Sequence, residues 1–144
     1  MHIEDLYNEW AKDGTINIED IGRNSADIPK LHNKYFRWYS EEGLRLKKLK
    51  ADYKLLVKLK TDYYSGNMDT TELKEHGWDP QPLKILRSDI PTYIESDKDI
   101  VTLSLKIGYQ ESIVEYLESI IRQINNRNFV LKNIIDWEKF RTGA

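Results

Sequence analysis

The feature that most constrains the fold is a helical pattern of apolar residues inside the most basic part of the chain. Leu46, Leu49, Tyr53 and Leu56 recur with the alternating spacing of three and four residues that is typical of one helix face. The pattern lies within residues 44–60, which hold seven basic side chains and one acidic side chain. This segment is therefore predicted to be an amphipathic α-helix with one packing face and one cationic face.

The lysines of this segment gather on one side of the predicted helix. At about 100° per residue, Lys47, Lys50, Lys54 and Lys58 fall within an arc of roughly 80°, beside the apolar residues. The whole chain has a net charge of -2, whereas residues 29–60 carry ten basic and three acidic side chains. A basic block of this kind favours a localised contact with a polyanion. The alternative is a solvated face that only keeps the helix in solution.

The length of 144 residues fits a single domain. Residues 1–28 form an acidic N-terminal segment. Residues 29–64 are predicted to form one long helix, because Pro29 suits the first position of a helix. Gly43 is the weak point of this helix, because a glycine in a helix interior costs about 1 kcal/mol relative to alanine. The helix could break there.

Residues 65–99 are predicted to connect the long helix to a C-terminal helical pair at residues 100–142. Glycines and prolines interrupt any regular helix in the connecting region. Residues 82–86 and 92–95 are predicted to form short strands, a β-hairpin at most. Asp97 and Asp99 stand where carboxylates cap the exposed amides of a new helix.

The C-terminal helical pair is more apolar than a peripheral pair of helices needs to be. We expect this surplus apolar surface to form an oligomer interface, with a plain intramolecular core as the alternative. The residues assigned to the interface are Ile113, Leu117, Ile120, Ile124, Phe129, Ile134, Trp137 and Phe140.

The residues needed for several kinds of chemistry are missing from the sequence. There is no cysteine, and the three histidines are scattered without metal-ligand spacing. No glycine-rich nucleotide-binding loop occurs. The N-terminus lacks the features of a signal peptide, and no apolar run approaches the ~18 residues of a membrane span. We therefore expect a soluble cytoplasmic protein that is not an enzyme and holds no metal or cofactor.

Residues 56–66, Leu-Val-Lys-Leu-Lys-Thr-Asp-Tyr-Tyr-Ser-Gly, resemble the signature of the UvsY family of phage recombination mediators. In that signature, two basic residues separated by one spacer precede x-Asp-Tyr-Tyr-x-Gly. Residues 96–100 and 127–137 also resemble the family pattern. The paired basic residues contribute to single-stranded DNA binding in the family, and they match Lys58 and Lys60 here. The second can be arginine in the family, so lysine replaces a bidentate fork with a point charge.

The resemblance implies a mainly α-helical, homo-oligomeric ring, either a hexamer or a heptamer, that binds single-stranded DNA. It also implies a phage-encoded protein of the host cytoplasm that does not hydrolyse ATP. Such a protein helps a UvsX-class recombinase to displace the phage single-strand-binding protein. The alternative function is a helical scaffold or adaptor that binds an acidic protein through its lysine face.

On this interpretation Lys47, Lys54, Lys58 and Lys60 contact DNA phosphates, and a base stacks on Tyr64. Lys60 falls near the packing face of the helix, so its ammonium is expected to reach outward or to pair across a subunit boundary. Neither ammonium of the signature is expected to be buried.

The neighbouring Tyr63 continues the packing face of the helix. A packing role is therefore favoured for Tyr63 over a stacking role.

Overall fold

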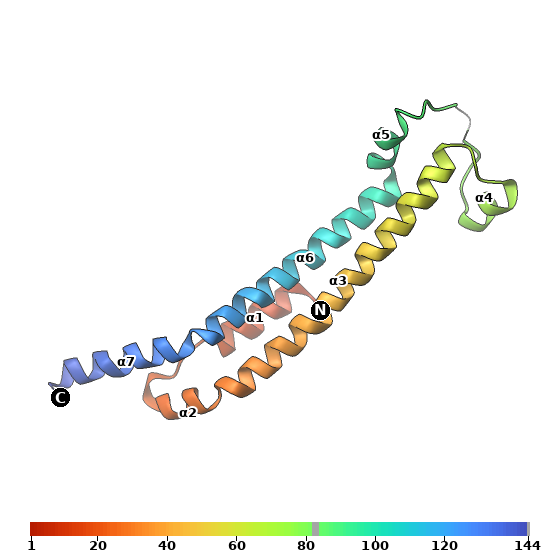
Figure 1. Cartoon of the computed structure of the whole chain (residues 1–144). Coiled ribbons are helices and arrows are strands. Elements are labelled where there is room, and N and C mark those ends of the chain that lie inside the picture. Colours follow the sequence, from red (N-terminus) through yellow and green to blue (C-terminus); the bar gives the residue numbers. More distant parts are fainter. Residues whose placement is uncertain (82–83, 144) are drawn as a thin grey trace. The chain divides into compact units, whose positions relative to one another are not determined.

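The computed structural model describes residues 1–81 and 84–143, and its regular elements there are all helical (Figure 1). In chain order they are α1 (Ile3–Asp13), the short 3-10 helix η1 (Ile18–Asp20), α2 (Ile21–Ala26), α3 (Ile28–Tyr64), α4 (Thr70–His76), α5 (Ile90–Glu95), α6 (Lys98–Asn125) and α7 (Arg127–Thr142). The mainly α prediction is confirmed. Among the described residues, no helix is long and apolar enough to cross a membrane.

The long basic helix predicted from the sequence is present as α3, which has 37 residues and begins at Ile28. At 1.5 Å per residue it is ~55 Å long. The helix continues through Gly43, so the break considered there does not occur. A Cβ atom at Gly43 would meet no other atom within 4 Å, so packing does not require a glycine at this position.

The chain divides into two compact units. The first unit combines Met1–Arg45 with Gln110–Ala144, and the second unit is Leu46–Tyr109. Each of the helices α3 and α6 contributes one part to each unit. That the two units belong to one domain stays a prediction.

The core of the first unit is built by α1, α3 and α6. Its fully buried side chains are Leu6, Tyr35, Ile113, Leu117, Ile120 and Ile124. The last four were expected at an oligomer interface, and that expectation is wrong because each is at most 1% exposed within its own chain. The intramolecular alternative holds for them. Burial of each such side chain contributes ~1.5–3 kcal/mol to folding.

The other half of the expected interface set lies on α7 and has a different environment. Phe129, Trp137 and Phe140 are 66%, 60% and 77% exposed, while Ile134 is half-buried. The rings of Trp137 and Phe140 stack with their centroids 5.8 Å apart. We call Phe129, Trp137 and Phe140 the α7 patch.

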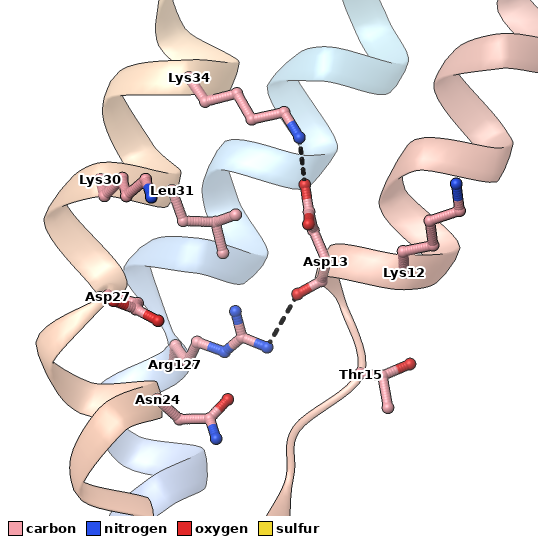
Figure 2. Close-up of a pocket in the computed structure, with 9 residues that line it drawn as sticks. All are labelled: Lys12, Asp13, Thr15, Asn24, Asp27, Lys30, Leu31, Lys34 and Arg127. Atoms are coloured by element: carbon pink, nitrogen blue, oxygen red, sulfur yellow. Dashed lines mark hydrogen bonds and ion pairs between the residues drawn. The ribbon is translucent and has the colours of Figure 1, made fainter.

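Polar contacts hold α1, α3 and α7 together in the first unit (Figure 2). Lys34 Nζ lies 2.6 Å from Asp13 Oδ2, and the Tyr35 hydroxyl donates to the same oxygen at 2.8 Å. The buried Arg127, at the start of α7, donates from Nη2 to the Asp13 carbonyl at 3.1 Å. Burial alone would raise the pKa of Asp13, but the hydrogen bonds from Lys34 and Tyr35 outweigh it and hold that pKa below its usual value. Asp13 therefore stays ionised and keeps its partners at neutral pH.

The β-hairpin expected in the connecting region is wrong for residues 92–95, which lie in α5. The reason is Pro91, which stands in the first turn of that helix, where its missing amide hydrogen costs nothing. Residues 84–86, from the other expected strand, have no regular structure, and Pro82 lies outside the described residues.

Candidate nucleic-acid interface

Four exposed lysines line one side of α3 in the second unit, and we call Lys47, Lys50, Lys54 and Lys58 the lysine row. Three or four residues separate successive members, so each is displaced by ~4.5–6 Å along the helix axis from the one before. Within residues 1–81 and 84–143, no carboxylate lies within 4.0 Å of the ammonium groups of Lys47, Lys54 and Lys58. These three cations can therefore meet an external anion without first breaking an ion pair.

Asp52, the one acidic residue between residues 44 and 60, pairs with a lysine outside the row. It forms an ion pair with Lys48, whose Nζ lies 3.2 Å from Asp52 Oδ2. Such an exposed pair contributes only ~0.2–0.5 kcal/mol to the helix. Asp52 thus leaves Lys47, Lys54 and Lys58 with their positive charge.

Lys60 has a different environment from Lys58. Lys60 is only 4% exposed, and its Nζ lies 3.1 Å from Asp97 Oδ2 and 2.8 Å from Asp99 Oδ2. The same Nζ is 4.0 Å from the centre of the Trp78 ring. The expectation that Lys60 is exposed, or pairs across a subunit boundary, is therefore wrong. Its position lies about 200° around the helix from Lys58, so it faces the start of α6 rather than the side of the lysine row.

Asp97 is the acceptor at the centre of this buried group. Its Oδ1 accepts hydrogen bonds from the backbone amides of Asp99 and Ile100 at 2.9 and 3.2 Å, which confirms the predicted helix cap for Asp97. Its Oδ2 accepts a hydrogen bond from the Tyr64 hydroxyl at 2.6 Å. Burial would raise the pKa of Asp97, but the hydrogen bonds from Tyr64 and Lys60 outweigh it and lower that pKa. Asp97 is therefore a carboxylate at neutral pH.

The two tyrosines of the signature are held by hydrogen bonds. The Tyr63 hydroxyl donates to the Asp79 carbonyl at 2.6 Å, and its ring packs edge-on against Trp78 with centroids 5.3 Å apart. The packing role favoured for Tyr63 is confirmed. Burial and the hydrogen bond to Asp97 raise the pKa of Tyr64, and its ring lies 5.7 Å from that of Tyr93. Base stacking on Tyr64 stays a prediction.

Sequence reasoning did not single out Trp78, although it covers the Lys60 ammonium. The sequence feature that could have indicated this role is the position of Trp78 directly after Gly77. Gly77 ends α4 with a φ of 69° and directs the chain back toward α3. We call Lys60, Tyr63, Tyr64, Trp78, Asp97 and Asp99 the Lys60 cluster. The signature therefore separates into an exposed cation, Lys58, and a buried one, Lys60.

Comparisons with known proteins agree with the fold and with the family resemblance. The family model described as the recombination, repair and ssDNA binding protein UvsY matches residues 9–144. The recombination protein uvsY of Enterobacteria phage T4 is 25% identical over 143 residues, which cover 99% of each chain.

Solved structures show the same fold. A crystal structure of the bacteriophage T4 recombination mediator protein UvsY, lattice type II, matches with a TM-score of 0.84 at 25% identity, over 99% of this chain and 98% of that chain. The lattice type I crystal structure matches with a TM-score of 0.82 at 24% identity, over 95% and 98% of the two chains. With a family model that matches nearly its whole length, this chain belongs to the UvsY family of recombination, repair and single-stranded DNA binding proteins.

Proposed function

We propose that this chain is a recombination mediator that holds single-stranded DNA on its lysine row. In this role it helps to load a UvsX-class recombinase and to displace the phage single-strand-binding protein. Membership of the UvsY family supports the proposal at the level of recombination, repair and single-stranded DNA binding. The observation that carries it is the row of exposed lysines on α3, three of which have no carboxylate partner among the described residues.

The proposed contacts are electrostatic. Lys47, Lys54 and Lys58 each neutralise a phosphate, and the release of condensed counterions supplies the affinity. Phosphate contacts carry no sequence information, so binding is expected on any single strand. This suits a mediator, which has to act wherever single-stranded DNA is exposed.

Lys60 is proposed as a positioning residue. Its ammonium is buried between Asp97, Asp99 and Trp78, where a phosphate has no room to replace the carboxylates without opening the cluster. Its ion pairs join the end of α3 to the start of α6 within the second unit. Lys60 thus supports the helix that presents Lys58 and makes no phosphate contact of its own.

Assembly into a homo-oligomeric ring, a hexamer or a heptamer, is the second part of the proposal. The α7 patch supplies its apolar contact, because three large aromatic side chains on one short helix remain exposed in the single chain. A ring presents several lysine rows to one strand and so raises avidity by ~10² to 10⁴. A strand that follows the ring is bent or stretched, which loosens a competing protein bound to the same strand.

The adaptor alternative uses the same lysines and places an acidic protein on them. No structural observation favours it over nucleic acid. It differs in one consequence, because an adaptor does not change the access of a recombinase to coated DNA.

The test measures the DNA-dependent ATPase of a UvsX-class recombinase on DNA coated with the phage single-strand-binding protein. Addition of the wild-type chain should restore the ATPase. The row variant (Lys47→Ala, Lys54→Ala and Lys58→Ala) should fail to restore it. The control variant (Lys74→Ala, Lys84→Ala and Lys106→Ala) removes the same charge from exposed positions outside the row and should act like wild type. Equal restoration by both variants would refute the assignment to the lysine row.

A further inference from the structure

A pocket of about 550 Å³ lies in the second unit. Its apolar lining includes Ile85, Ile90 and Ile94, and its polar lining includes Ser65, Asn67 and Arg87. Among the described residues that line it, none is acidic. Its size falls within the range of about 300–1,000 Å³ that is usual for small-molecule sites.

The pocket continues the lysine row. Thr61, in the last turn of α3, and Ser65, directly after the helix, both line it. At about 100° per residue, both positions fall within the same ~80° arc as the lysines. At 1.5 Å per residue, they follow Lys58 by ~4.5 and ~10 Å. A strand with its phosphates on the lysine row therefore reaches the mouth of this pocket.

We propose that the pocket takes one nucleobase of the single strand whose phosphates lie on the lysine row. The inference rests on the proposed function and adds to it a contact with a base. Isoleucine side chains cover the faces of an unstacked base, as apolar walls do in sites that hold flipped bases. The Asn67 amide offers both a donor and an acceptor to a base edge, whichever base is present. The Arg87 guanidinium supplies a planar cation that stacks on the ring of the base.

The pocket shown in Figure 2, in the first unit, is less suited to a nucleic acid. It is also lined by cations, but Lys34 and Arg127 there already bind Asp13. The carboxylate of Asp27 adds a second negative charge to its lining. The charge of the second-unit pocket is not offset in this way.

The test compares the affinities of the full chain for a thymidine oligonucleotide and for an abasic oligonucleotide of the same length. The two probes share their phosphates and differ only in the bases. Arg87→Ala removes the cation, and Ser65→Leu fills the pocket from an exposed position without adding an aromatic ring. Lys84→Ala is the matched control, because it removes a nearby exposed charge that does not line the pocket. Circular dichroism verifies that each variant keeps its helices.

The wild type should bind the thymidine probe more tightly than the abasic probe. In both pocket variants the ratio of the two affinities should fall about 5-fold, the lower end of what one stacked base contributes. Lys84→Ala should keep the preference. A preference that survives in both pocket variants, or equal wild-type affinity for both probes, would overturn the pocket proposal and leave the phosphate contacts standing. No binding of either probe would overturn the proposed function itself.

Discussion

Replacing Lys60 by alanine should lower the free energy of unfolding by about 3 to 5 kcal/mol, the usual effect of removing one partner from a buried ion pair. The variant leaves Asp97, which is 8% exposed, without its cation. The matched change Lys58→Ala, on the same helix but at an exposed position, should stay within about 0.5 kcal/mol of wild type. Urea unfolding followed by circular dichroism measures both values.

The Lys60 effect is attributable to the pair if it depends on Asp97. In a double-mutant cycle, Lys60→Met combined with Asp97→Asn should destabilise the chain by less than the sum of the two single changes. Each single change leaves the other member of the buried pair without its partner, whereas the double variant removes both charges. Equal stabilities of Lys60→Ala and Lys58→Ala would contradict the buried placement of Lys60. Any loss of DNA binding in Lys60→Ala should accompany its loss of stability.

Replacing both Trp137 and Phe140 by glutamate should dissociate the proposed ring and weaken the apparent affinity for single-stranded DNA by ~10² to 10⁴, because avidity is lost. The two side chains are 60% and 77% exposed, so the fold of the single chain should survive. Sedimentation reports the mass of the assembly, and titration with an oligonucleotide reports the affinity.

The matched control for the α7 patch places glutamate at Val101 and Leu105, two exposed apolar positions on α6. It introduces the same charge at a different surface. An unchanged mass in the α7 variant would show that the patch is not the assembly surface. A smaller mass with full affinity would show instead that avidity contributes little to binding.

Periodicity predicted the helices because it is a local property. The apolar stripe of α3 and the C-terminal helical pair are visible in the sequence, and the pair is present as α6 and α7. Periodicity does not reveal what an apolar face packs against. Ile113 and its neighbours on α6 form a stripe that suits a second copy as well as a neighbouring helix, and the structure places them against α1 and α3.

The burial of Lys60 could not be predicted from the sequence for a similar reason. Asp97, its partner, is far along the chain, and no local pattern links the two residues. The sequence did indicate that Lys60 lies near the packing face of its helix, because helical periodicity is local. It did not indicate which residue packs against that face. In the connecting region, Thr92 and Tyr93 favour a strand by composition, whereas Pro91 favours the first turn of a helix, and the helix prevails.

The central claim is that the lysine row binds DNA phosphates, and the salt dependence of binding tests it most directly. Each phosphate contact with a single strand contributes about 0.7 to the slope of log affinity against log salt concentration. The row variant should therefore reduce the magnitude of the slope by about 2 per subunit if all three contacts are made. The control variant, with the same net charge, should keep the wild-type slope. A row variant with both the affinity and the slope of wild type would contradict the account.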